Sequence, residues 1–247
     1  MVSTCAQNCK SAGGSQSKIS LQNPSLIAIN NQDEILILVD SGLVLLDKNL
    51  NEISKYPCEL IGYNDMAIDE DTVIYLVKCV GESSIKIVDY KNKIEKQFER
   101  SNIEQLKGFK PRFIRVVNNQ IFIISTCSLR IDQDNKQLIE ELFGESRIYI
   151  FDKNSFNLKH FLNLKEIGMY QPWNLMIDKN SNIYTTAYHI DRKKRILCKF
   201  SIDGKLLDNI DLEHTYLSND IIFTDDNFIF FKESEISVYS ERFNGFS

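Results

Sequence analysis

The sequence has 247 residues, of which 43% are hydrophobic and 26% are charged, and its formal net charge is −5. This is the balance of an ordinary globular protein, and all-β domains of this length commonly fold as one unit. The acidic balance argues against a protein whose main task is to neutralise phosphates, so no nucleic-acid partner is expected. The 10 glycines form no phosphate-cradling loop, which excludes P-loop and dinucleotide-binding folds.

The N-terminal residues 1–16 are small and polar and are predicted to be a flexible lead-in. They carry neither the basic nor the apolar part of a secretory signal, and no transmembrane segment is expected in the chain. A cytoplasmic protein is therefore expected if the chain is complete. Residues 2–5 loosely resemble a lipoprotein cleavage box, so removal of a leader would instead indicate an exported protein or a lipoprotein.

One motif, a turn that leads into a short apolar strand, returns five times along the chain. Its copies are residues 24–30, 63–69, 111–117, 172–178 and 218–224. A second apolar strand follows each copy, and in four copies a third strand then ends in an Asp or a Ser-x-Asp turn. Multi-strand units that recur at about 40 to 50 residues are typical of propeller blades. The sequence therefore predicts an all-β protein, a single β-propeller domain over residues 17–247 with five recognisable four-stranded blades.

The last of these blades is predicted to be completed by the other end of the chain. Fourth strands are expected at residues 52–56, 94–98, 158–162 and 206–212, and the fifth repeat lacks one. An N-terminal strand at residues 17–22 is expected to fill this place, because closing the ring removes an exposed sheet edge. A ring of six blades is the alternative.

An insertion near residues 131–145 lengthens the third repeat. Leu138 and Leu142, like Ile139 and Phe143, follow the four-residue spacing of a helix face. The sequence therefore predicts a short amphipathic helix here, and Leu138, Leu142 and Phe143 are candidate partner-binding residues.

This pattern resembles the NHL-type and bacterial six-bladed propellers over about residues 18–240. Residues 148–154 and 196–205 look like the third strand and turn of those proteins, and residues 171–178 look like their opening strand. The resemblance implies the architecture of the chain and does not specify an activity.

The opening strands of propeller blades line the central channel, so their first residues are expected to face one mouth. Candidate ligand-binding residues there are Trp173, Arg112 and, at the end of a second strand, His189. For Trp173 the alternative role is packing between blades, and for His189 it is that of a surface side chain.

Carboxylate and amide side chains take equivalent positions in other repeats. These candidate metal ligands are Asp65, Asn174, Asp220, Asn64 and Asn219. Their oxygens suit Ca²⁺ or another divalent cation, and here the chain is similar to the senescence-marker and gluconolactonase propellers. That resemblance implies metal-dependent hydrolysis of lactones or esters. The alternative is that Asx side chains satisfy main-chain amides at strand entry.

Two functional hypotheses follow from these observations. The first is a non-catalytic binding or interaction module that recognises a protein or a small ligand at a channel mouth, and the absence of a catalytic signature favours it. The second is a divalent-metal-dependent, lactonase-like or esterase-like hydrolase with its site in the central channel.

Overall fold

The computed structural model describes most of the chain. The described residues are 21, 23–30, 32–57, 62–69, 72–79, 83–99, 109–126, 128–131, 138–142, 145–178, 180–212, 221–224, 227–232 and 235–240. Their regular structure is almost entirely β, with one short 3-10 helix, η3 (Leu164–Ile167). In this part of the chain no helix has the length and apolarity needed to cross a bilayer.

Four antiparallel sheets of four strands follow one another along the chain. The first sheet contains β1 (Leu26–Ile29), β2 (Ile35–Val39), β3 (Gly42–Leu46) and β4 (Glu52–Pro57). The second contains β5 (Asp65–Asp69), β6 (Val73–Lys78), β7 (Ser84–Asp89) and β8 (Ile94–Glu99). The third contains β9 (Pro111–Val117), β10 (Gln120–Ser125), β13 (Arg147–Asp152) and β14 (Leu158–Asn163). The fourth contains β15 (Met169–Ile177), β16 (Ile183–His189), β17 (Lys194–Phe200) and β18 (Leu206–Asp211).

The fifth repeat forms a sheet of three strands, β19 (Ile221–Thr224), β20 (Asn227–Lys232) and β21 (Glu235–Ser240). All five predicted repeats are thus sheets, and the four predicted outer strands are β4, β8, β14 and β18. The expected closing strand at residues 17–22 lies outside the described residues except for Leu21. This leucine is not in a strand, and it packs against apolar side chains of β2 and β3.

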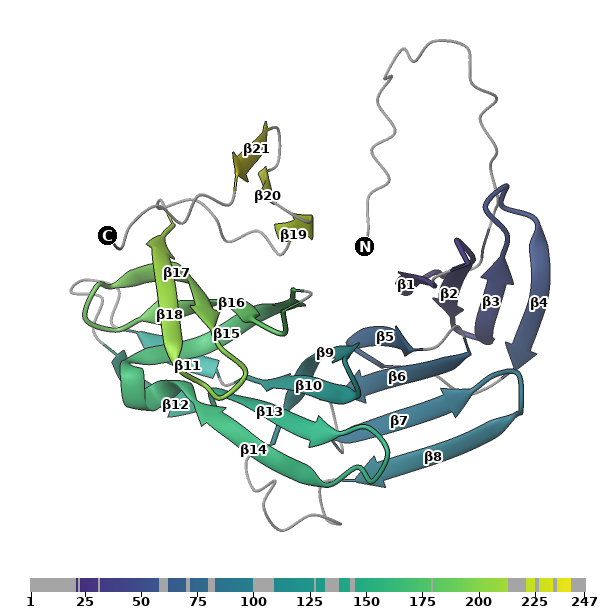
Figure 1. Ribbon diagram of the computed structural model, residues 1–247, viewed down its shortest axis with the longest axis horizontal. Coiled ribbons are helices and arrows are strands. Elements are labelled where there is room, and N and C mark those ends of the chain that lie inside the picture. Colours follow the sequence, from purple (N-terminus) through teal and green to yellow (C-terminus); the bar gives the residue numbers. More distant parts are fainter. Residues whose placement is uncertain are drawn as a thin grey trace.

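The four complete sheets follow one another along an arc, each with its first strand on the inner side (Figure 1). β5 packs beside β1 and β9, and β9 packs beside β15. Because consecutive strands are antiparallel, each first strand begins at the end of the sheet where its second strand passes to the third. We call this common end, formed by the first residues of β1, β5, β9 and β15, the entrance face.

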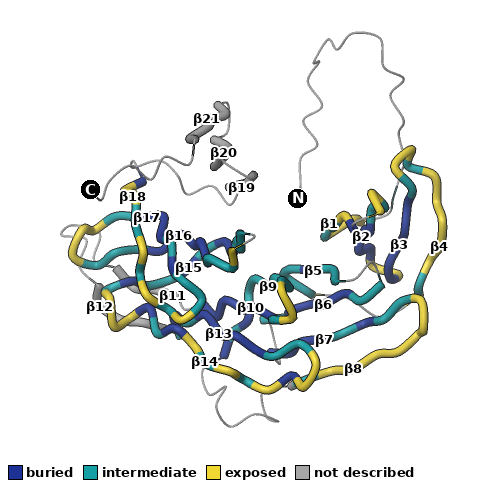
Figure 2. Tube along the Cα trace, in the orientation of Figure 1, coloured by how far each residue is buried: buried dark blue, intermediate teal, exposed yellow. Residues whose placement is uncertain are grey.

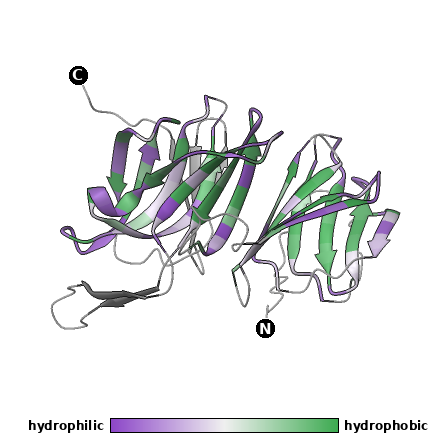
Figure 3. Cartoon of the chain, turned by 90° about the horizontal axis from the view of Figure 1, so that it is seen from below, coloured by the Kyte–Doolittle hydropathy of each residue, from purple (hydrophilic) through white to green (hydrophobic). Residues whose placement is uncertain are grey.

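The core lies between successive sheets. Residues of β10 such as Phe122 and Ile124 pack against Ile196 and Cys198 of β17, and all four are fully buried. The middle strands are apolar on both faces, and the second and third sheets each lie between two neighbouring sheets. The outer strands β4 and β8 face solvent (Figure 2). Figure 3 shows the same contrast in the hydropathy of the strands.

The acid that recurs at the end of the third strand closes the turn to the fourth. Asp47 Oδ1 accepts main-chain N–H groups of Asn49 and Asn51, both at 2.8 Å. Asp152 Oδ1 accepts those of Asn154 and Ser155 at 3.1 and 2.9 Å. Hydrogen bonds from Ser155 are the main reason that the pKa of Asp152 falls to about 2. These acids are turn-forming residues, as Asx side chains commonly are.

The helix predicted near residues 131–145 is wrong for the part that the structure describes. β11 (Ser128–Ile131) and β12 (Leu138–Leu142) form an antiparallel hairpin, in which Ser128 faces Leu142 and Ile131 faces Leu138. Residues at positions i and i+4 share a face of a strand as well as of a helix, so this short pattern does not discriminate between the two. Pairing with β11 decides in favour of the strand.

Candidate ligand-binding site

Two neighbouring inner strands are irregular, β9 where it begins at the entrance face and β15 over most of its length. On β9, Pro111 faces Ser125 and Phe113 faces Ile124 of β10, so Arg112 is an extra residue without a partner in the ladder. Such a bulge bends a strand and changes the direction of its side chains.

β15 contains two bulges in succession. Between Tyr170 and Met176 it takes six residue steps, while the facing stretch of β16 from Tyr188 to Tyr184 takes four (176 − 170 against 188 − 184). Gln171 and Asn174 accordingly have left-handed backbones, with φ of 48° and 64°. This conformation is tolerated by Asn but is unfavourable for Gln by about 1–2 kcal/mol.

Buried hydroxyl groups satisfy the backbone groups that the bulges remove from the ladder. Thr185 Oγ1 lies 2.9 Å from the carbonyl oxygen of Asn174 and 3.1 Å from that of Trp173. Thr186 Oγ1 donates to the Trp173 carbonyl at 2.8 Å, and Ser146 Oγ accepts the main-chain N–H of Gln171 at 3.0 Å. The irregular backbone is therefore fixed by its neighbours.

Arg195 supports the first bulge from β17. Its Nη2 donates to Gln171 Oε1 at 3.0 Å, and burial lowers the pKa of this arginine. Because its guanidinium holds Gln171, we regard Arg195 as a positioning residue for this strand.

These bulges bring Arg112 and Trp173 together from two sheets. The guanidinium carbon of Arg112 lies 3.6 Å from the centroid of the Trp173 ring, and the Phe113 ring meets that indole edge-on with centroids 5.7 Å apart. A cation stacked on an indole is stabilised by about 0.5–2 kcal/mol, depending on its desolvation. Burial lowers the pKa of Arg112, and the nearby sulfur of Cys79 opposes this. Arginine nevertheless stays charged at neutral pH.

The same strand carries two hydrogen-bond donors without acceptors. Trp173 Nε1 and Asn174 Nδ2 are enclosed and have no partner among the described residues. Asn174 is only 7% exposed. A buried donor without an acceptor costs about 1–3 kcal/mol, so native proteins rarely contain two at adjacent positions unless there is a reason.

Two of the three described metal-ligand candidates, Asp65 and Asn64, already accept hydrogen bonds within the protein. Asp65 Oδ2 accepts Arg115 Nη1 at 2.6 Å and the main-chain N–H of Ile114 at 2.9 Å. Asn64 Oδ1 accepts the main-chain N–H of Cys79 at 2.8 Å. Asn219 and Asp220 lie outside the described residues, and within those residues no three His, Cys, Asp or Glu side chains are grouped to hold a metal ion. The metal site stays a prediction.

The other candidate residues are placed as follows. His189 ends β16, and its Nδ1 accepts the main-chain N–H of Arg192 in the next turn at 3.4 Å. Leu138 and Leu142 lie on β12, and Phe143 falls outside the described residues. The hairpin is inserted at the entrance face, and its strand β11 lies beside β15.

The sequence singled out Arg112, Trp173 and Asn174 but missed the residues that fix the irregular backbone of β15. These are Ser146, Gln171, Thr185, Thr186 and Arg195. A pair of adjacent threonines in an otherwise apolar strand is a signal for polar backbone groups nearby. This signal does not show which neighbouring strand accepts hydrogen bonds from those threonine hydroxyls.

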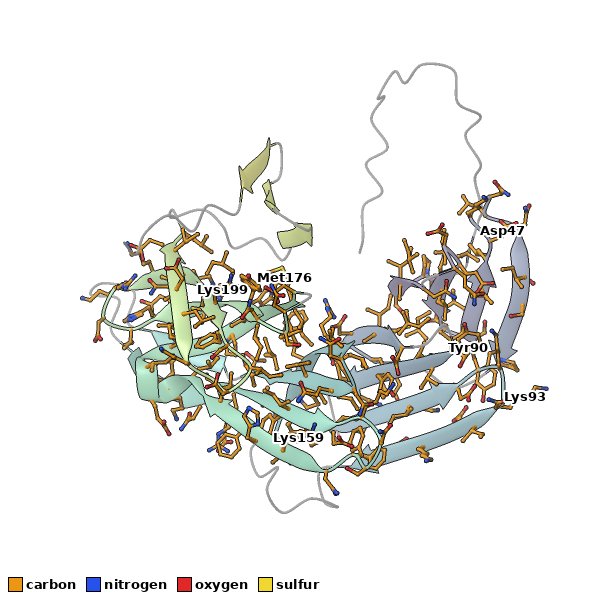
Figure 4. All side chains as sticks on the ribbon, in the orientation of Figure 1. Asp47, Tyr90, Lys93, Lys159, Met176 and Lys199 are labelled. Atoms are coloured by element: carbon orange, nitrogen blue, oxygen red, sulfur yellow. The ribbon has the colours of Figure 1, made fainter. Side chains whose placement is uncertain are left out.

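A separate cavity of about 590 Å³ lies between the first two sheets, away from Arg112 and Trp173. Its wall includes Glu34, Ile53, Tyr56, Tyr90 and Lys93. Figure 4 shows Tyr90 and Lys93 at the turn after β7, at the far end of the sheet from the entrance face. None of the predicted ligand-binding residues lines it, and we do not assign the site to it.

The chain matches no protein-family model and no curated protein. Among solved structures, the WD40 beta propeller domain of Doa1 is similar with a TM-score of 0.59 and 11% identity, covering 87% of this chain and 62% of that one. Together with the arc of four-stranded sheets, this decides the architecture. The fold is a β-propeller.

Two further solved structures show the same propeller likeness. A complex of KlAtg21 with the coiled-coil of AgAtg16 gives a TM-score of 0.55 at 12% identity, covering 89% of this chain and 66% of that one. The extracellular domain of BT3049, a putative hybrid two component system from B. thetaiotaomicron, gives 0.53 at 12% identity, covering 92% and 30%. This chain thus spans less than two thirds of each of the three. At such identities the likeness concerns the fold alone, and the NHL-type relationship stays a prediction.

Proposed function

We propose that this propeller is a non-catalytic binding module whose ligand docks at the entrance face on Arg112 and Trp173. One observation carries the proposal: bulges in two adjacent inner strands hold a charged guanidinium on an indole at that face. β-bulges are over-represented next to functional sites, where they redirect side chains. The strain of a left-handed Gln171 supports the same conclusion, because strained backbones cluster at binding sites.

A protein is the ligand that we favour. Aromatic and arginine side chains dominate the binding energy of protein interfaces, and one structure with the same fold is described as a complex with a coiled-coil. The β11–β12 hairpin emerges at the entrance face and lies beside β15, so it is placed to extend the contact. We therefore propose Leu138 and Leu142 as additional contacts for the partner.

Partner capture with matched variants tests this proposal. The tagged protein is used to purify a partner from its native cell extract, and Trp173→Ala and Arg112→Ala are each expected to reduce recovery at least tenfold. Lys159→Ala is the control, because Lys159 lies on the outer strand β14 (Figure 4) and pairs with Asp152 at 3.3 Å. Undiminished capture by both entrance variants, with an unchanged melting temperature, would overturn the proposal.

A further inference from the structure

The entrance site is composed of donors. Arg112 forms no ion pair with any carboxylate of the described residues, and Trp173 Nε1 and Asn174 Nδ2 add two donors without acceptors. The carboxylate of Asp65, on the neighbouring strand β5, is engaged by Arg115 and the Ile114 N–H. In a chain of net charge −5, a cation at the entrance face that pairs with no carboxylate of the described residues suits a negative group on a ligand.

Resting on the proposed function, we infer that the ligand presents a carboxylate to the Arg112 guanidinium. A guanidinium offers a planar fork of N–H groups that matches the two oxygens of a carboxylate. One cation with two neutral donors balances a single negative charge. A phosphate dianion is commonly held by several basic side chains, and among the described residues only Arg112 stacks on Trp173.

The carboxylate meets Arg112 first. The indole N–H and the Asn174 amide are enclosed while the guanidinium is stacked on the ring. Movement of the guanidinium toward the ligand changes the surroundings of the indole, on which it is stacked. The state of the indole therefore reports on the ligand.

Trp173 is the only tryptophan in the chain, so its fluorescence reports on this site without labelling. The intact protein is titrated at constant ionic strength with sodium acetate, with the peptide Ac-Ala-Glu-Ala-NH2, with its Gln counterpart, with inorganic phosphate and with sodium chloride. We expect a saturable change with acetate and the Glu peptide, a much weaker one with phosphate, and none with the Gln peptide or chloride. Tighter binding of the Glu peptide than of acetate assigns the carboxylate to a protein, and the reverse order assigns it to a small molecule.

Variants test whether the fluorescence response to carboxylates depends on Arg112. Arg112→Gln is expected to weaken the carboxylate response at least about tenfold, since it removes a charged hydrogen bond. Arg112→Lys should retain part of the response, and Lys159→Gln should retain all of it. A missing response in the wild type, an equal response in Arg112→Gln, or stronger binding of phosphate overturns the inference. If partner capture still depends on Trp173 in that case, the proposed binding function stands and only the carboxylate is wrong.

Discussion

A single carboxylate, that of Asp65, ties the inner strand of the second sheet to Arg115 on the inner strand of the third. Its Oδ2 accepts Arg115 Nη1 at 2.6 Å and the main-chain N–H of Ile114 at 2.9 Å. The Arg115 side chain is 37% exposed, and pairs that face solvent contribute at most about 1 kcal/mol. The hydrogen bond from the N–H of the fully buried Ile114 contributes more to stability than the ion pair does, because an unpaired buried donor costs about 1–3 kcal/mol.

Replacement of Asp65 should therefore separate these two contributions. Asp65→Asn keeps an oxygen for the Ile114 N–H and should lower the free energy of unfolding by about 0–1 kcal/mol. Asp65→Ala removes both contacts and should lower it by about 1–3 kcal/mol. Urea unfolding followed by circular dichroism measures the difference. Equal losses in the Asn and Ala variants would show that the ion pair dominates.

The same residue discriminates between the two functional hypotheses. Because Arg115 already occupies the Asp65 carboxylate, we expect millimolar Ca²⁺ to leave the melting temperature of the wild type unchanged. A rise in melting temperature with Ca²⁺ that disappears in Asp65→Asn would restore the metal-dependent hydrolase. Sodium chloride at equal ionic strength is the control.

The Thr185 and Thr186 hydroxyls, which bond the backbone of β15, are expected to contribute to the stability of the site to different extents. Thr185→Val keeps the shape of the buried side chain but removes the donor shared by the Trp173 and Asn174 carbonyls. We expect a loss of about 1–3 kcal/mol in the free energy of unfolding, together with a shifted Trp173 emission maximum. Thr186→Val is the matched control, since the Trp173 carbonyl then still lies within reach of Thr185. Equal losses in the two variants would contradict this assignment.

Local signals in the sequence were sufficient to predict the repeats. Short apolar runs and a turn-forming acid such as Asp47 or Asp152 are recognised within a few residues, and the structure places strands and Asx turns there. The hairpin strand Leu138–Leu142 was mistaken for a helix because its partner lies in a separate segment of the insertion. Local spacing does not contain that information.

Only part of the site could be predicted from such local signals in the sequence. Trp173 and Arg112 were identified by their place at the start of an inner strand, but their contact depends on bulges in β9 and β15. A bulge is a mismatch of register between two strands, and one extra residue redirects a side chain. The sequence of a single strand does not show its register, that is, which residue of the neighbouring strand each of its residues faces. Arg195 was missed for this reason, because it contacts Gln171 across an intervening strand.

The turn acids predict a loss of stability in acid. The pKa of Asp152 is lowered to about 2 in the folded protein, first by hydrogen bonds from Ser155, whereas an unfolded Asp titrates near 3.8. The folded state therefore binds fewer protons between these values. The contribution of Asp152 is fully present above about pH 4 and is lost as the pH falls toward 2.

Asp152→Asn tests this pH dependence. The variant should show a shallower decrease of the urea midpoint between pH 5 and pH 2.5 than the wild type. Asp40→Asn is a control that leaves the turn intact, because Asp40 lies after β2 and accepts a hydrogen bond from the Asn23 side chain. A wild-type slope in Asp152→Asn would mean that other acids dominate acid unfolding.

Gly204 is expected to accept a side chain poorly, because it lies against the neighbouring blade. Its φ is +91°, and an added Cβ would overlap Leu162 Cδ2, which belongs to a buried side chain of β14. Gly204→Ala should therefore lower the free energy of unfolding by about 2–4 kcal/mol through backbone strain and overpacking. Gly168→Ala, with φ of +71° and no atom within 3.5 Å of the new Cβ, should cost only the strain, about 1–2 kcal/mol.

Combining Gly204→Ala with Leu162→Ala should lose less than the sum of the single changes, since the truncated leucine makes room for the methyl group. Additive losses in urea unfolding would show that the two blades do not meet at this contact.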